Sequence, residues 1–172
     1  FMASYCILGG TGFVGSRLIA HLVNRGHRIT VPTRDPERAR HLRVQPSVGI
    51  VRADVHAPGT LAGLLGGSDA VINLIGILNE SGRDGRGFRR AHVDLMQTLI
   101  AACESAGVSR VIQISALNAG APQASSHYLR SKGEAETLLR ATRLDWTILQ
   151  PSVIYGPGDA FLNRFAGLLK LI

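Results

Sequence analysis

Ser115, Tyr128 and Lys132 are the residues of this chain whose types and spacing could carry out a proton transfer. Tyr128 and Lys132 are four positions apart, so they share one face if they lie on a helix. A lysine ammonium beside a phenol favours the phenolate, so we expect the pKa of Tyr128 to fall below its usual value of about 10. Such a tyrosine can give or accept a proton near neutral pH, while the Ser115 hydroxyl holds a substrate oxygen beside it.

A second chemical signal is the glycine-rich turn of Gly9, Gly12 and Gly15, which follows the short apolar run at residues 5–8. Gly9 can take backbone angles closed to other residues, Gly12 lets a pyrophosphate approach the main chain, and Gly15 lets the next helix pack closely on the sheet. The N-terminus of that helix offers N–H groups and partial positive charge to an anion. We favour nucleotide binding over a plain hairpin, because a helical pattern stands where a hairpin needs a second strand.

An alternation of strands and helices positions these residues. Short apolar runs predict strands at residues 5–8, 28–31, 48–52, 70–74, 110–114 and 146–150. Helical spacing predicts helices from residue 14 to a C-terminal glycine at 26, from 88 to 106 and from about 128 to 142, with shorter segments at 37–42 and 61–65. Strands too apolar to alternate indicate an α/β fold with a doubly wound parallel sheet, the Rossmann fold, whose strand C-termini share one ligand-binding edge.

The length of 172 residues suits one domain with a single core. Residues 161–172 form an amphipathic pattern that stops on apolar residues without a polar end. We therefore expect residues 1–172 to be one nucleotide-binding domain in which 161–172 begin a truncated C-terminal part. A small C-terminal substrate domain is expected to be lacking.

Composition and charge exclude several functions. The net charge of +7 comes from scattered arginines with no aromatic residues between them, so we expect no nucleic-acid binding. A cluster of arginines at 83, 86, 89 and 90 is interpreted as solvated surface. The two cysteines lack the number and spacing of a disulfide framework or a metal site. No apolar run is long enough to cross a membrane and no signal segment is visible, so we expect a cytoplasmic protein without an integral membrane segment.

The segment Gln150-Pro151-Ser152-Val153-Ile154-Tyr155-Gly156-Pro157 completes the motif set. Together with the glycine turn, Ser115 and the Tyr128/Lys132 pair, it resembles the short-chain dehydrogenase/reductase superfamily, in its extended and atypical branch of the NAD-dependent epimerase/dehydratase type. Residues 115–119, 128–132 and 151–162 are also similar to the atypical reductase-like proteins related to an accessory subunit of respiratory complex I. The resemblance covers essentially the whole chain.

The resemblance implies a role for each matching residue. Tyr128 would be the acid/base, Ser115 would position the substrate oxygen, and Lys132 would bind the nicotinamide ribose. Asp54 would accept from the adenine amino group or simply cap a helix, and Asn73 would flank the nicotinamide ribose or simply satisfy a buried turn. The expected cofactor-binding residues are Gly9, Thr11, Gly12, Phe13, Val14, Gly15, Arg34, Asp54, Val55, Asn73, Leu74, Gly76, Lys132, Pro151 and Val153.

The choice of cofactor depends on Thr33-Arg34-Asp35, after the second predicted strand. An acidic residue about twenty positions beyond the glycine loop accepts from the 2′-hydroxyl of NAD, whereas an arginine there accommodates the 2′-phosphate of NADP. Arg34 comes first, and its guanidinium can stack on adenine as well as pair with phosphate. NADP is therefore favoured, and Asp35 keeps NAD open.

Two functions stay open. One is an NAD(P)H-dependent oxidoreductase, or an epimerase/dehydratase that works through transient oxidation, acting on a small molecule that the sequence does not identify. The other is a non-catalytic dinucleotide-binding protein with a structural or assembly role, as the similarity to the accessory subunit implies. His92 stands where many relatives carry asparagine, and we interpret it as a packed, hydrogen-bonded residue. Superfamily analogy also allows a homodimer through the two long helices.

Overall fold

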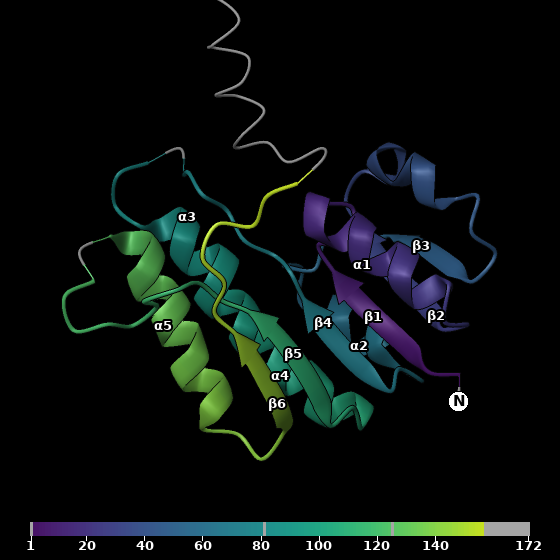
Figure 1. Ribbon diagram of the computed structural model, residues 1–172. Coiled ribbons are helices and arrows are strands. Elements are labelled where there is room, and N and C mark those ends of the chain that lie inside the picture. The colour runs from purple at the N-terminus through teal and green to yellow at the C-terminus, as the bar shows by residue number, and fades with distance from the viewer. Residues whose placement is uncertain (1, 81, 125, 157–172) are drawn as a thin grey trace, which may run out of the picture.

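Six parallel strands form one sheet in the part of the chain that the computed structural model describes, residues 2–80, 82–124 and 126–156 (Figure 1). In sheet order they are β3 (Val48–Arg52), β2 (Arg28–Thr33), β1 (Ser4–Leu8), β4 (Ala70–Asn73), β5 (Arg110–Ile114) and β6 (Asp145–Leu149). The chain runs outward from β1 to β3 and then returns to place β4 on the other side of β1. This switch confirms the predicted doubly wound parallel sheet and marks the edge where such folds bind ligands.

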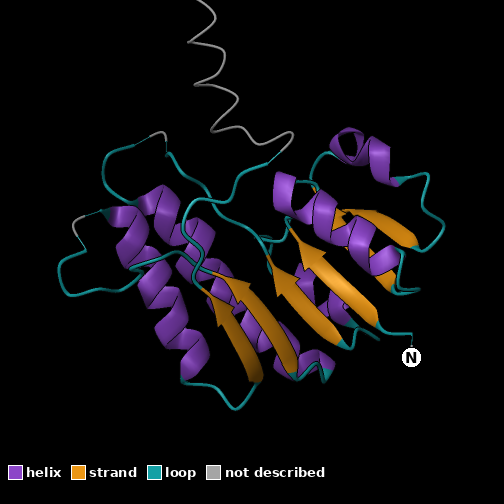
Figure 2. Ribbon diagram, viewed as in Figure 1, coloured by secondary structure: helices purple, strands orange, loops and turns teal. Residues whose placement is uncertain are grey.

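Helices cover both faces of the sheet (Figures 1 and 2). One face carries α1 (Phe13–Val23) and the 3-10 helix η1 (Pro36–Leu42), and the other carries α2 (Thr60–Leu65), α4 (Leu95–Ala106) and α5 (His127–Arg140). The predicted helix at 88–106 comprises α3 (Arg86–Phe88), the π-helical turn η2 (Arg89–Asp94) and α4, joined without a break. π-Turns inside longer helices occur frequently at functional sites.

Alternation along each strand divides the core into two layers. Ile7 of β1 and Ile72 of β4 pack with Ile19 of α1, whereas Leu8 and Val71 point to the other face and pack with α4. All four residues of β4 are buried, as expected for a strand covered on both sides. The layers hold the strand C-termini in register, so that residues following β1, β2 and β4 meet at one edge.

Most element boundaries agree with the sequence prediction. Gly107 takes a left-handed φ of +71° as the C-cap of α4, and Gly26, at +80°, follows α1. β2 extends two residues beyond the predicted end, through Pro32 to Thr33, because it pairs with β3 over that length. The expected C-terminal continuation at 161–172 lies outside the described residues. Within the described ranges no helix has the length and apolar character needed to span a membrane.

Candidate functional site

The glycine turn contains two positions that the chain's own backbone restricts to glycine. Gly9 has a left-handed φ of +77°, and a Cβ there would lie 3.1 Å from the carbonyl carbon of Leu74. A Cβ on Gly15 would lie 2.6 Å from both Cα and O of Gly10, closer than real Cβ contacts allow. These glycines bring β1, α1 and the end of β4 together, independently of any ligand.

Gly12 differs from both. Its backbone is extended, at φ −79° and ψ 177°, and a Cβ there would meet only the carbonyl oxygen of Gly9, at 3.3 Å. Gly12 is the N-cap of α1, and neither a capping side chain nor an acidic residue satisfies the first turn of this helix. The space beside Gly12 and the uncapped helix N-terminus together fit a pyrophosphate.

A cavity of about 710 Å³ opens beside this turn, across the ends of β1, β2 and β4. Seven residues expected from the sequence line it: Gly9, Thr11, Gly12, Arg34, Val55, Leu74 and Gly76. The lining also includes Asp35, which was considered for the 2′-hydroxyl of NAD, and Ile75, which lies within the segment 73–76 expected to flank the ribose. The sequence did not predict the other lining residues as cofactor contacts: Pro32, Thr33, Arg38, Ala53, His56 and Ile77. The expected contacts Phe13, Val14, Gly15, Asp54, Asn73, Lys132, Pro151 and Val153 lie outside this lining.

Two arginines mark the β2 end of the cavity. The guanidinium groups of Arg34 and Arg38 are exposed, and neither has an ion-pair partner among residues 2–80, 82–124 and 126–156. The Asp35 carboxylate accepts a hydrogen bond from the backbone N–H of Glu37, at 3.1 Å, and so caps η1. Arg38 stands four residues after Arg34, and this spacing next to a predicted short helix was the signal that could have identified it.

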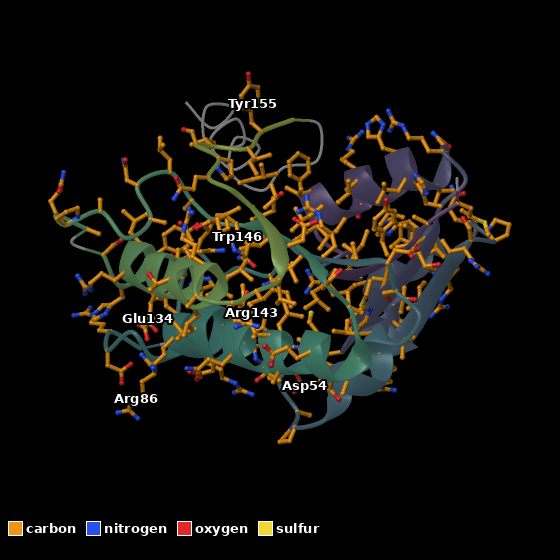
Figure 3. The ribbon with its side chains drawn as sticks, turned by 90° about the horizontal axis from the view of Figure 1, so that it is seen from below. Asp54, Arg86, Glu134, Arg143, Trp146 and Tyr155 are labelled. Atoms are coloured by element: carbon orange, nitrogen blue, oxygen red, sulfur yellow. The ribbon has the colours of Figure 1, made fainter. Side chains whose placement is uncertain are left out.

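The loop after β3 adds His56 to the cavity. Asp54 Oδ1 accepts from the backbone N–H of His56, at 3.0 Å, so the carboxylate stabilises the turn as its alternative interpretation allowed. Figure 3 shows Asp54 on the side of the sheet that carries α4. Partial burial lowers the pKa of His56, against the opposing charge of Asp54, while Arg90 and Arg34 lower it further.

Lys132 lies at the other end of the site, beneath Gly76. The lysine is 4% exposed, and its Nζ donates to the carbonyl oxygen of Ile114 at 3.1 Å. A Cβ on Gly76 would lie 3.3 Å from this Nζ, so the ammonium reaches a residue that lines the cavity. Burial lowers the pKa of Lys132 to about 8, against the opposing effect of Glu136.

Tyr128 is partly buried against two rings from the preceding helical segment. Its ring makes edge contacts with Phe88 and His92, with centroids 5.9 and 5.6 Å away. Burial raises the pKa of Tyr128, so the phenol is protonated at neutral pH. The expectation that Lys132 lowers the pKa of Tyr128 is wrong for this structure, because desolvation outweighs the effect of an ammonium that is bonded to Ile114.

Ser115 follows the carbonyl that Lys132 contacts. Its backbone N–H donates to Leu149 of β6 at 2.8 Å, which ties the end of β5 to the last strand. The hydroxyl is buried and is the one buried side-chain polar atom within the described ranges that has no hydrogen-bond partner. Leaving such a group unsatisfied costs about 1–3 kcal/mol. The hydroxyl therefore has its hydrogen-bonding capacity unused, although Ser115 is not among the residues that line the cavity.

His92 is packed and hydrogen-bonded, as interpreted from the sequence. Nδ1 lies 2.8 Å from Oγ of Ser131, and Nε2 accepts from the backbone N–H of Ile77 at 3.5 Å. Ser131 in turn donates to the carbonyl oxygen of Tyr128 at 2.9 Å. Burial and the nearby Lys132 charge lower the pKa of His92 to about 3, so the imidazole stays neutral near pH 7. It links the wall of the cavity to the helix that carries Tyr128.

Asn73 holds a turn, which was the alternative left open for it. Its amide donates to Gln113 Oε1 at 2.8 Å, and its Oδ1 accepts from the backbone N–H of Ile75 at 3.1 Å. The side chain is 2% exposed. Any contact between the β4 end and a ribose would therefore come from the residues after Asn73.

Two close contacts position α5. Ser126 caps its N-terminus by accepting from the backbone N–H of Leu129 at 3.1 Å. Gly133 packs directly on the backbone of Gly120, with no room for a Cβ. This contact fixes the loop after Ser115 against the helix that carries Tyr128 and Lys132.

The loop before α3 is tied down by Glu80. This carboxylate accepts from the backbone N–H groups of Gly85 and Gly87 at 2.9 and 2.8 Å, so it caps the start of the helical segment. Two of the four clustered arginines form ion pairs: Arg86 with Asp84, and Arg89 with Asp94 and Glu134. Arg86 and Glu134 lie on the α4 and α5 side of the molecule (Figure 3). No group of three metal-ligating side chains occurs within the described residues.

The segment after β6 returns toward the start of α1. The backbone N–H of Leu117 donates to the carbonyl oxygen of Pro151 at 2.9 Å, and Val153 is 58% exposed. A Cβ on Gly156 would lie 3.4 Å from Cζ of Phe13, so the segment approaches the glycine turn again. Pro151 and Val153 thus pass near the site without forming part of the cavity wall.

Comparison with known proteins identifies the family. Residues 9–160 match the family described as NAD(P)H-binding. The chain belongs to this NAD(P)H-binding family. It is 34% identical over 164 residues to the mitochondrial NADH dehydrogenase [ubiquinone] 1 alpha subcomplex subunit 9 of Mus musculus, a match that covers 93% of this chain and 43% of the relative. It is 35% identical over 168 residues to a ceramide reductase of Caulobacter vibrioides, covering 96% of this chain and 50% of the relative.

Solved structures agree on the fold. The UDP-glucuronic acid 4-epimerase of Bacillus cereus, in complex with NAD, superposes with a TM-score of 0.80 at 20% identity, over 97% of this chain and 64% of the epimerase. The resemblance to the complex I accessory subunit is confirmed, and the fold is shared with NAD-binding epimerases. This NAD(P)-binding chain spans about half the length of the curated relatives it matches.

Proposed function

We propose that this NAD(P)-binding domain prefers NADP and serves an oxidoreductase, or an epimerase/dehydratase that works through transient oxidation. The observation that carries the proposal is the buried, unpartnered hydroxyl of Ser115 beside the carbonyl that receives Lys132 Nζ. A hydroxyl in this position can donate to a substrate carbonyl oxygen. The bound nicotinamide would supply or accept a hydride at C4.

Tyr128 would give a proton to the substrate oxygen during reduction. Its pKa is raised by burial, so it holds that proton at neutral pH and is ready to act as a general acid. Lys132 would leave the Ile114 carbonyl, at least in part, to donate to the nicotinamide ribose next to Gly76. The ammonium would then also stabilise the phenolate that forms when Tyr128 loses its proton.

The preference for NADP rests on the β2 end of the cavity. Arg34 and Arg38 are free to pair with a 2′-phosphate, whereas the carboxylate of Asp35 is engaged in capping η1. Asp54 and Val55 would border the adenine, and Gly9 to Gly15 would surround the pyrophosphate. Titration with NADPH and NADH at matched salt tests this part, and tighter binding of NADH would contradict it.

Turnover tests the reaction. NADPH oxidation is measured with a panel of ketones and aldehydes, for the wild type and for Tyr128→Phe, with cofactor affinity measured in parallel. We expect Tyr128→Phe to keep its affinity for NADPH and to lose at least about 100-fold in kcat, the usual contribution of a positioned acid. Turnover that survives the substitution would refute the role of Tyr128.

A non-catalytic role is the second candidate. One support is the 34% sequence identity to the mouse NADH dehydrogenase subunit. The other is that Lys132 bonds to Ile114 rather than to Tyr128. In that case the dinucleotide would stabilise the fold or an assembly. Tight NADPH binding that raises the thermal midpoint, together with no turnover of any carbonyl in the panel, would favour this function over the first.

Location and oligomeric state complete the proposal. Cys6 and Cys103 are buried and unpaired, which suits a reducing compartment, and we propose the cytosol. Localisation of a tagged protein tests this, since the mouse relative is mitochondrial. A homodimer through α4 and α5 rests on superfamily analogy, and sedimentation velocity tests it.

A further inference from the structure

Two charged side chains are buried within the described ranges, and they carry opposite charges. Lys132 is 4% exposed and Glu136 is 6% exposed, whereas every other acidic, lysine or arginine side chain described is more open to solvent. The two residues are four apart on α5, so they occupy the same face one turn apart. Burial of a charge is expensive unless an opposite charge or hydrogen bonds compensate it. The burial of two opposite charges one helical turn apart therefore indicates that they have a role.

The carboxylate of Glu136 is held in place from two elements. Oε1 accepts from Gln150, which directly follows β6, at 2.7 Å, and Oε2 accepts from Arg140 at 3.3 Å. The Arg140 guanidinium itself lies over the ring of Trp146, 4.9 Å from its centroid. Glu136 is therefore fixed by Gln150 and Arg140, and it does not bond Lys132 directly.

Lys132 has few compensating groups. Its Nζ has one hydrogen bond, to the carbonyl oxygen of Ile114. The titratable groups that interact with its charge are Glu136 on α5 and His92 on η2, and Tyr128 stands one turn earlier on α5. His92 and Tyr128 are neutral near pH 7. Burial lowers the pKa of Lys132, and the Glu136 carboxylate is the anion that raises it again.

We propose that Glu136 is a positioning residue of the site, whose buried carboxylate keeps Lys132 in the ammonium form that a nicotinamide ribose requires. A neutral amine at Lys132 would have a lone pair in place of one donor, and it would not stabilise a phenolate at Tyr128. Because Gln150 binds the same carboxylate, the charge on Lys132 is also linked to the start of the segment at 150–156. The role of Lys132 toward ribose rests on the proposed function, but the coupling of Glu136 to Lys132 does not.

The test exploits the small number of lysines. Lys132 and Lys170 are the two lysines of the sequence, so a sample labelled with 13C at lysine Cε gives two resonances, which K170R assigns. The wild type is expected to show a titration of Lys132 near pH 8. In Glu136→Gln, which keeps an amide oxygen for Gln150, we expect the pKa of Lys132 to fall by about one pH unit or more.

The control is Glu134→Gln, two residues earlier on the same helix. Glu134 is half exposed and pairs with Arg89, so its neutralisation is expected to leave the titration of Lys132 unchanged. Glu136→Asp, which retains the charge, is expected to titrate closer to the wild type than Glu136→Gln. A folded Glu136→Gln with an unchanged midpoint would overturn the proposal. If this variant does not fold, a wild-type midpoint below pH 7 would overturn it instead.

Cofactor affinity separates the coupling from the proposed function. The ratio of the NADPH dissociation constants of Glu136→Gln and wild type is expected to be near one at pH 6 and at least about five-fold at pH 8, where the variant has lost its ammonium. A merely structural role for Glu136 would weaken binding equally at both pH values. A changed titration without any effect on NADPH would contradict the role of Lys132 in the proposed function while leaving the coupling intact.

Discussion

The two ends of the candidate site differ in whether their polar groups are already bonded to other residues of the chain. At the β2 end, the guanidinium groups of Arg34 and Arg38 and the N-terminus of α1 have no partners from the described chain. At the Tyr128 end, Lys132 is bonded to Ile114 and His92 to Ser131, and the Ser115 hydroxyl is the one buried side-chain polar atom of the described residues without a partner. The first end is preorganised for an anion. The second end must exchange internal hydrogen bonds for contacts with a ligand.

Cofactor affinity and catalytic chemistry can therefore be changed separately in this domain. Changes to the Arg34 or Arg38 side chain should alter cofactor binding alone, because no ion pair within the described residues depends on either guanidinium group. Changes at the Tyr128 end should alter stability as well, since its polar groups also hold elements together.

The glycine turn gives the largest contrast. Gly15→Ala forces a Cβ to 2.6 Å from backbone atoms of Gly10, and we expect a loss of at least about 3 kcal/mol of unfolding free energy. Gly12→Ala places its Cβ in the cavity, and we expect stability to change by less than about 1 kcal/mol while NADPH affinity falls at least about ten-fold. Urea unfolding and fluorescence titration measure the two quantities. Equal destabilisation by both substitutions would remove the distinction between fold and ligand glycines.

Acid pH should act through the Tyr128 end. The folded state binds a proton at His92 only near pH 3, whereas the unfolded state binds it near pH 6.5, so protonation favours unfolding between these values. Stability is therefore expected to fall as pH is lowered from 6.5, by about 2 kcal/mol at pH 5 from this residue alone. The matched variant is His92→Gln, in which the pH dependence over this interval should become shallower. An unchanged slope would mean that His92 titrates normally.

Arg38 tests the contact with the 2′-phosphate at the β2 end of the cavity. We expect Arg38→Ala to lose about 1.5–3 kcal/mol of binding free energy for NADPH, the contribution of one charge-assisted hydrogen bond, and to leave NADH affinity unchanged. Arg40→Ala, on the same short helix but outside the cavity lining, is the control. Isothermal titration measures both cofactors, and an equal loss for NADH would argue against contact with the 2′-phosphate.

Glu80 should give the smallest effect. Glu80→Ala removes the carboxylate that accepts from Gly85 and Gly87, and we expect a loss of about 1 kcal/mol, typical of a helix cap. Hydrogen exchange should report faster amide exchange at Gly85 and Gly87, with NADPH affinity unchanged. Protection that persists in Glu80→Ala would show that other contacts hold this loop.

The sequence predicted the sheet and most helix boundaries because they depend on local patterns. Apolar runs, helical spacing and terminal glycines such as Gly107 carry their information within a few residues. The glycine turn and Arg34 were found in the same way. The sequence did not predict Arg38 and His56 as cavity residues. Whether these side chains face the cavity depends on how η1 and the loop after β3 pack against the sheet, which no local pattern contains.

Effects of burial were the part that sequence reasoning could not supply. The spacing of Tyr128 and Lys132 indicated a lowered tyrosine pKa, but desolvation acts in the opposite direction and depends on Phe88 and His92, forty and thirty-six positions away. Likewise, two roles were open for Asn73, beside a ribose or in a buried turn, and its bond to Gln113 on the next strand is what the sequence could not predict. Both outcomes depend on long-range packing that a linear pattern does not contain.

In the proposed complex, one dinucleotide spans the site from Arg34 to Lys132. The most direct measurement follows the 13C resonance of Lys132 Cε while the protein is titrated with NADPH or with 2′,5′-ADP, which lacks the nicotinamide ribose. We predict that both compounds bind competitively, that NADPH shifts the Lys132 resonance, and that 2′,5′-ADP leaves it unchanged. Saturation with NADPH that does not move the Lys132 resonance would contradict the account.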